Sequence, residues 1–322
     1  MNETILSIQI PIGGSFSLFK NAWEGRAVFE TLSIATGLHG DQVNGLHIAS
    51  RLTRFLESVV EKREEDYRLL GKIQLLPAIN VPALETGSRV WSFDGMDLDL
   101  AFPGNDAGDP TERICHTILR HTGESSCAVL LESSPRLYNC VPHVRILHPD
   151  RTMKKFARAT LLNIGRVIKE HEIPKTQLTR YWTERGIPAF SILCGRADVY
   201  SPDYCDSIVQ GLINLMCVMG VLGNQKQKSE KGTIEFHSLG DECQITANRA
   251  GLFEPEVRLG DRIGSGGLLG SIRDLRTGNL LEEIIAPEHG RVLALREHPL
   301  VYEKEPITVL VGEKKKSRLW PF

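Results

Sequence analysis

TGLHGDQVNG, residues Thr36–Gly45, follows an apolar run typical of a buried strand and precedes a helical pattern. A His at such a strand–helix junction, with a carboxylate three residues later, can place both side chains on one metal cation. Here the His is His39, but the residue three positions later is Gln42. A carboxamide carries no charge and is a poorer zinc ligand than the Asp or Glu oxygen normally used. The segment therefore predicts an incomplete metal site, whose meaning depends on the other ligands.

Length and composition limit the classes of protein that need to be considered. The chain has 322 residues, enough for two domains, and its 41% hydrophobic and 24% charged residues are typical of a globular protein. A net charge of −2 gives no sign of nucleic-acid binding. No apolar run approaches the roughly 18 residues of a membrane span, and no signal peptide is expected. Seven scattered cysteines without a C-x-x-C pair indicate reduced thiols and predict a cytoplasmic protein.

Strand-like and helix-like segments alternate from residue 27 to about residue 222. The predicted strands are Val28–Ala35, Ile73–Ile79, Ala128–Leu131 and Ala189–Leu193. The predicted helices are Gln42–Lys62, Pro110–His121, Met153–His171 and Pro202–Leu222. This alternation predicts an α/β fold with a twisted, mostly parallel or mixed sheet and helices on both faces.

The pattern changes after Gly223. Residues 224–232, NQKQKSEKG, form a polar stretch typical of a linker, and short strands punctuated by Gly and Pro follow. We therefore predict three regions: an α/β domain at 1–223, a linker at 224–232, and a small all-β barrel or sandwich at 233–322.

Several segments, in this order, resemble the succinylglutamate desuccinylase/aspartoacylase family. They are Gly37–Gly45 (GLHGDQVNG), Asn80-Val81-Pro82 with Arg89, Asp97–Gly104 (DLDLAFPG), Glu132–Val144 (ESSPRLYNCVPHV), Gly186–Gly195 (GIPAFSILCG) and Ala250–Gly270 (AGLFEPEVRLGDRIGSGGLLG). The resemblance covers about residues 25–315. It implies a zinc-carboxypeptidase-like fold and a zinc-dependent hydrolase of N-acyl amino acids, which acts on C–N bonds other than peptide bonds.

The resemblance also implies a ligand set, and this chain departs from it. The family binds zinc through the His and Glu of an H-x-x-E motif and a second His. His39 matches the first ligand, Gln42 replaces the Glu, and Ser133 (or Ser134, one residue later) stands where the second His belongs. The resemblance therefore implies three metal positions, His39, Gln42 and Ser133, that are degenerate.

The catalytic positions implied by the resemblance have changed as well. Leu193 stands in place of the general base, and Asp99-Leu100 in place of the Asn-Arg pair that grips a substrate carboxylate. Arg89, which would polarise the scissile carbonyl, matches the family. Loss of a general base alone costs roughly 10²–10⁴ in rate.

Three hypotheses follow from these departures. The leading one is a pseudoenzyme, a binding or scaffold subunit without a cofactor, which forms a homo-oligomer or a hetero-oligomer, the latter with an active family member. The second is an active deacylase or esterase, with a remodelled zinc site or with Ser133 as a nucleophile beside His39. The third is a sensor that binds a small molecule in the old pocket, where Asp99 favours a cationic or neutral ligand. Cys194 follows Leu193 on the predicted strand and should therefore face the core.

Overall fold

The computed structural model describes residues 2–11, 13–26, 29–226, 230 and 232–312. The chain divides into two compact units, Met1–Ser134 with Pro142–Phe236, and Pro135–Val141 with His237–Phe322. The boundary thus falls after residue 236, and the short segment 135–141 belongs to the second unit although it lies within the first predicted domain. Val28 of the first predicted strand and residues 227–229 and 231 of the predicted linker lie outside the described residues.

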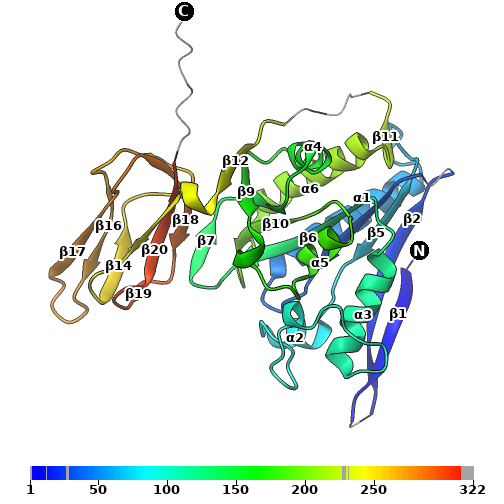
Figure 1. The fold of residues 1–322 in the computed structure, drawn as a ribbon, viewed down its shortest axis with the longest axis horizontal. Helices are drawn as coiled ribbons and strands as arrows, with labels where there is room; N and C mark the ends of the chain where they lie inside the picture. Colours follow the sequence, from blue (N-terminus) through cyan, green and yellow to red (C-terminus); the bar gives the residue numbers. More distant parts are fainter. Residues whose placement is uncertain (1, 12, 27–28, 227–229, 231, 313–322) are drawn as a thin grey trace, which may run out of the picture. The chain divides into compact units, whose positions relative to one another are not determined.

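Among the described residues, the main sheet has nine strands in the order β1-β2-β5-β3-β6-β10-β8-β9-β12, and the chain passes from the first unit to the second within β12 (Figure 1). Their bounds are β1 Asn2–Gln9, β2 Ser15–Glu24, β3 Thr31–Thr36, β5 Lys72–Leu76, β6 Cys127–Ser134, β8 His143–Leu147, β9 Ile164–Ile168, β10 Ala189–Arg196 and β12 Glu235–Ser238. The central strands β5, β3, β6 and β10 are parallel, whereas β1, β2 and β8 add antiparallel pairings. This confirms the predicted mixed sheet. A small separate ribbon pairs β4, Tyr67–Leu69, with β11, Leu222–Asn224.

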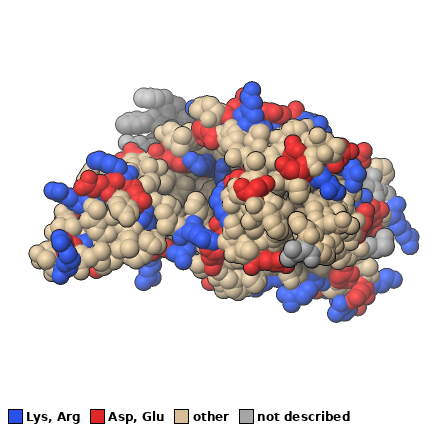
Figure 2. All heavy atoms as spheres, turned by 90° about the horizontal axis from the view of Figure 1, so that it is seen from below, with Lys and Arg blue, Asp and Glu red and all other residues tan. Residues whose placement is uncertain are grey.

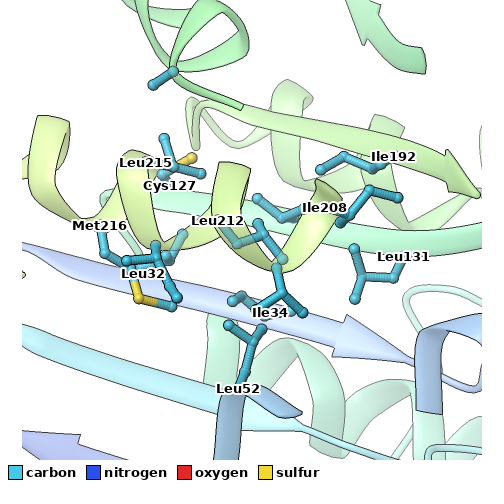
Figure 3. Close-up of a cluster of buried hydrophobic side chains, with 14 of the residues drawn as sticks. Leu32, Ile34, Leu52, Cys127, Leu131, Ile192, Ile208, Leu212, Leu215 and Met216 are labelled. Atoms are coloured by element: carbon cyan, nitrogen blue, oxygen red, sulfur yellow. The ribbon is translucent and has the colours of Figure 1, made fainter. Parts of the chain in front are cut away.

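Helices cover both faces of this sheet. Their bounds are α1 Val43–Val60, α2 Val81–Thr86, α3 Pro110–Thr122, α4 Arg151–Ala159, α5 Leu178–Glu184 and α6 Pro202–Met219. Helices α1, α4 and α6 share one apolar core with alternate strand residues, and Figure 3 shows Leu52 and Leu212 of these helices packed near Ile34. The intervening strand residues form a second core with α3 and α5. Burial of both faces explains why the central strands are continuous apolar runs.

Most predicted elements are present, with shifted ends, but one prediction is wrong. The predicted helix Met153–His171 ends at Ala159, and Ile164–Ile168 is strand β9, which pairs in parallel with β8. Leu161 adopts a positive φ of 60°, which a continuing helix cannot accommodate. The β-branched residues that follow then fit the sheet. The antiparallel strands β1 and β2 at the start of the chain had not been assigned from the sequence.

The described residues of the second unit form two antiparallel sheets around an apolar core. One sheet has the order β13-β20-β18-β15, with β7 also paired to β18, and the other has the order β17-β16-β14-β19. The bounds are β7 Tyr138–Cys140, β13 Glu242–Thr246, β14 Gly251–Pro255, β15 Arg262–Ile263, β16 Leu268–Arg273, β17 Leu280–Ile285, β18 Gly290–Arg296, β19 Leu300–Val301 and β20 Pro306–Val311. The predicted small all-β region is therefore confirmed as a sandwich.

Charge and hydropathy of the folded chain match its composition. On the face drawn in Figure 2, basic and acidic side chains are interspersed. Within the described residues, no helix combines the length and apolarity needed to cross a membrane. None of the seven cysteines forms a disulfide.

Candidate functional site

The loop between β3 and α1 carries His39 and Gln42 at the carboxyl end of the central strands. Both side chains are buried, His39 to 1% exposure. The loop packs tightly against the region of α2. The amide of Gly40 donates to the carbonyl oxygen of Ser88 (2.9 Å), and a Cβ at Gly40 would overlap the carbonyl of Ala83. The position of His39 is therefore fixed by backbone contacts that require glycine at residue 40.

Both ring nitrogens of His39 are engaged. Nε2 donates to Oδ1 of Asp97 at 2.8 Å, and Nδ1 accepts from Nε2 of Gln42 at 2.9 Å. With the amide donating to Nδ1, the imidazole is neutral, and its protonation would require the Gln42 amide to turn over. In either orientation the Gln42 amide is hydrogen-bonded to Nδ1 of His39, the ring nitrogen that does not contact Asp97.

Asp97 connects His39 to the other side chains of the site. Its Oδ1 also accepts the backbone amide of Asp99 at 3.0 Å, and its Oδ2 lies 3.5 Å from Nη2 of the half-exposed Arg89. Burial, the largest single influence, raises the pKa of Asp97, but the hydrogen bond and charge of His39, the amide of Asp99 and the charge of Arg89 together outweigh it, and the net pKa is lowered. Burial lowers the pKa of His39, but Asp97 and Asp99 outweigh it, and the net pKa is raised. The Asp97 carboxylate thus favours the protonated form of His39, but the imidazole can adopt that form only after the Gln42 amide turns over.

Asp97 was not among the site residues expected from the sequence. The sequence nevertheless contains a feature that points to Asp97. It is the first residue of the DLDLAFPG segment, and a functional His usually needs an acceptor that orients it.

Ser133 and Ser134 end strand β6 and have different surroundings. Oγ of Ser134 donates to the carbonyl oxygen of Gly195 at 2.7 Å. Oγ of Ser133 is buried and has no hydrogen-bond partner among the described residues. The structure therefore does not bring Ser133 and His39 into the hydrogen bond that a Ser–His pair requires.

Asp99 and Leu100 lie in a short 3₁₀ turn, Leu98–Leu100, and differ sharply in exposure. Leu100 is 53% exposed, whereas Asp99 is 8% exposed. The Asp99 carboxylate accepts from Nε2 of Gln177 at 3.3 Å and from the backbone amide of Leu178 at 3.4 Å. Burial, followed by the nearby negative charge of Glu132, raises the pKa of Asp99 to about 6.

Leu193 lies on β10 opposite Glu132 of β6 and His143 of β8. The three residues share one face of the sheet, since laterally paired residues point the same way. Oε2 of Glu132 is 3.6 Å from Nη1 of Arg145, an ion pair next to the position of Leu193. Sequence reasoning missed both charged residues. The sequence feature that could have indicated this pair is the Glu in the strand CAVLLESS, whose other residues are apolar or small.

Cys194 faces the opposite side from Leu193, as predicted. It is fully buried in the core that includes α1 and α6. The loop after it is fixed by the buried Asn44 of α1, whose Nδ2 donates to the carbonyls of Cys194, Arg196 and Val199. Asn44 thus fixes the backbone that directly follows Leu193.

A cavity of about 1190 Å³ lies at the opposite end of the parallel strands. Its lining includes Glu30 just before β3, Val59 and Val60 at the end of α1, and Gly71 just before β5. None of the residues of the His39 site is part of this lining. In the described chain, no group of three or more His, Cys, Asp and Glu side chains is placed to hold a metal ion.

The profile of the succinylglutamate desuccinylase/aspartoacylase catalytic domain matches residues 29–219. The chain belongs to this family. The resemblance noted from the sequence motifs is thus confirmed, and with it membership of a family of N-acyl amino acid deacylases that are usually zinc-dependent.

Known relatives extend the match beyond the catalytic domain. An N-alpha-acetyl-L-2,4-diaminobutyric acid deacetylase of Halomonas elongata is 25% identical over 293 residues, covering 89% of this chain and 83% of that protein. A succinylglutamate desuccinylase/aspartoacylase structure from Rhodobacter sphaeroides is 21% identical with a TM-score of 0.77, covering 96% of this chain and 94% of that one. The product-bound structure of an ectoine utilization protein from Ruegeria pomeroyi has a TM-score of 0.76 at 21% identity. The match covers 96% of this chain and 93% of that one. The structural matches establish the shared fold.

Proposed function

We propose that this chain is a catalytically silent member of the deacylase family and acts as a binding or scaffold subunit. The observation that carries the proposal is the 2.9 Å hydrogen bond between Nε2 of Gln42 and Nδ1 of His39. A nitrogen that accepts this hydrogen bond has no lone pair left for a metal ion. In the proposal, the amide of Gln42 holds the imidazole in the position where a metal ion would otherwise hold it.

The residues at the family's ligand positions do not fit zinc. A catalytic zinc normally has three protein ligands that include His nitrogen and carboxylate oxygen or thiolate. The chain offers an imidazole already bound by Gln42, a carboxamide, and the hydroxyl of Ser133. This set brings no negative charge. At the position of the general base, Leu193 cannot accept a proton.

An activity screen tests this proposal. We expect the purified protein to hydrolyse N-acyl amino acids, including the N-acetyl-diaminobutyrate named for the Halomonas relative, no faster than its His39→Ala variant does. Release of free amine would be followed by fluorescent derivatisation, with and without added zinc. Turnover by the unaltered chain that disappears in His39→Ala would contradict the proposal. A variant at an exposed site, His289→Ala, controls for contaminating activity, which would be the same in all preparations.

A second candidate function, an active hydrolase, is favoured by the His39–Asp97 hydrogen bond of 2.8 Å. A carboxylate that orients an imidazole in this way is part of serine-hydrolase chemistry. In this candidate, Ser133 would displace Gln42 from Nδ1 and Arg89 would polarise the substrate carbonyl. Turnover that is lost in both His39→Ala and Ser133→Ala would support it.

The proposal includes assembly with a second copy of the chain or with an active family member in the cytoplasm. A scaffold role requires such a partner. Light scattering on the purified chain, alone and mixed with a relative that retains H-x-x-E, would reveal a particle larger than the 35.9 kDa monomer. Monomers in both samples would count against the scaffold role.

A further inference from the structure

Two cysteine thiols lie in contact within the core of the first unit, outside the set of residues around His39. Cys194 is in β10 and faces away from the side of Leu193, and Cys205 is in the first turn of α6. Both residues are fully buried, and the Cys194 thiol is hydrogen-bonded to the sulfur of Cys205. Strand β10 and helix α6 also contact each other. Two neighbouring thiols can form a disulfide within the chain, which an isolated thiol cannot do.

Asn44 of α1 contacts both cysteines. Its Nδ2 donates to the carbonyl oxygen of Cys194 at 3.1 Å, and Sγ of Cys205 donates to its Oδ1 at 3.5 Å. The same Oδ1 accepts the backbone amide of Ser201, just before α6, at 2.8 Å. One buried side chain therefore holds the end of β10 and the start of α6 together, which keeps the two sulfur atoms close.

The surroundings of Cys205 favour its thiolate, the form of cysteine that reacts with peroxides. The hydrogen bond from Cys194 lowers the pKa of Cys205, and the charge of Arg51 and a hydrogen bond with the backbone of Ser201 lower it further, so that together they outweigh burial. The start of a helix also stabilises a negative charge. In four other cysteines burial raises the pKa: Cys115, Cys127, Cys217 and Cys243. Cys205 is thus the better nucleophile among these thiols.

We propose that Cys194 and Cys205 are a modification site, at which a hydroperoxide converts the two thiols into a reversible disulfide between β10 and α6. With hydrogen peroxide, the Cys205 thiolate attacks one oxygen, the O–O bond breaks, and hydroxide leaves and takes up a proton to form water. Cys205 is then a sulfenic acid. The sulfur of Cys194 attacks the sulfenic sulfur and gives up its proton, the S–O bond breaks, and a second water leaves. Two thiols are oxidised to one disulfide, and one peroxide is reduced to two waters.

The segment between the two cysteines provides the route for a small oxidant. It contains the exposed residues Asp198, Tyr200 and Asp203. Asp198 also adopts a positive φ of 60°, a conformation that few residues other than glycine adopt. Loops open at a lower free energy than the strands and helices of a core. The peroxide therefore reaches the pair by local opening of this loop, without unfolding of the sheet.

The disulfide acts on the backbone next to the His39 site. Oxidation removes the hydrogen that Cys205 donates to Asn44. Asn44 fixes the loop after Leu193 and lies two residues after Gln42 in the sequence. The inference goes beyond the proposed function and does not depend on it, because thiol oxidation requires neither zinc nor turnover.

Peptide mapping of the full chain tests the inference. The reduced protein is treated with a small excess of hydrogen peroxide under native conditions, unfolded, alkylated and digested with trypsin. Cleavage after Arg196 places the two cysteines in separate peptides, 186–196 and 197–226. We expect mass spectrometry to find these peptides linked, and dithiothreitol to separate them. The count of free thiols should fall from seven to five, since 7 − 2 = 5.

Variants assign the role of each sulfur. Cys217 lies in the same tryptic peptide as Cys205, so that Cys217→Ser is a matched control and should form the link in the same yield. Cys205→Ser should abolish the link. In Cys194→Ser, dimedone should label Cys205, because its sulfenic acid has no neighbouring thiol to react with. Circular dichroism verifies the fold of each variant.

An unaltered chain that forms no link between peptides 186–196 and 197–226 would overturn the inference, and this result needs no variant. A link that persists in Cys205→Ser and is lost in Cys217→Ser would overturn it as well. Neither result bears on the proposed function. Turnover that depends on His39 would contradict the proposed function and would leave the disulfide inference standing.

Discussion

Replacing Gly40 with alanine is expected to destabilise the first unit by about 3 kcal/mol or more. The added Cβ would overlap the carbonyl group of Ala83 and the carbonyl oxygen of Ser88, which are backbone atoms that cannot rotate away. The loop carrying His39 would have to separate from the α2 region, and the hydrogen bond from the Gly40 amide to Ser88 would be lost. Urea denaturation followed by circular dichroism measures the change in unfolding free energy.

Gly87→Ala is a matched control in the same region. Gly87 ends α2 with a φ of 64°, and no atom lies within 4 Å of the position of its Cβ. Only the left-handed conformation is then penalised, which costs about 1 kcal/mol. Equal effects of the two substitutions would contradict the claim that the Gly40 contact, and not glycine flexibility, fixes the loop.

Asp99→Asn is expected to stabilise the protein at pH 8 by up to about 3 kcal/mol. The pKa of Asp99 is raised from 3.8 to about 6 by burial and by Glu132. The folded state therefore binds a proton more tightly than the unfolded state, and the ionised carboxylate destabilises the fold as pH rises from about 4 to about 6. Asparagine stays neutral, and Gln177 can turn its amide over to match it.

The pH dependence of the unfolding free energy distinguishes the removal of a buried charge from a change in side-chain packing. The gain in Asp99→Asn should be largest above pH 6 and should vanish below about pH 4, where Asp99 is protonated in both states. Asp106→Asn, at an exposed position, should change stability by less than about 0.5 kcal/mol at every pH. A variant that is less stable than the unaltered chain at pH 8 would show that the hydrogen bonds of Asp99 outweigh its desolvation.

Local patterns in the sequence were sufficient to predict much of the fold. The apolar run before His39 and the stripe after Gln42 correspond to β3 and α1 because burial on one or both faces leaves a clear periodicity. The predicted start at Pro110 is confirmed, and Asp109 before it forms a capping box with Glu112. The helix predicted over Met153–His171 failed because periodicity cannot detect the left-handed turn at Leu161.

The site was only partly predictable, because its contacts join residues far apart in sequence. His39 and Asp97 are 58 residues apart, and no local pattern pairs them. Glu132 and Arg145 meet because β6, β10 and β8 are neighbours in the sheet, which follows from topology. The motifs identified the positions of Gln42, Asp99 and Leu193. The contact of the Gln42 amide with Nδ1 of His39 depends on a side-chain conformation that only the structure supplies.

The central claim is that the amide of Gln42 has replaced the metal on His39. The most direct test of this claim is a measurement of bound zinc. The purified chain would be incubated with one equivalent of Zn²⁺ at pH 7.5, desalted, and measured by mass spectrometry of the metal against protein concentration. We expect the same background level, far below one zinc per chain, in the unaltered chain and in His39→Ala. About one zinc per chain that disappears in His39→Ala would contradict the account.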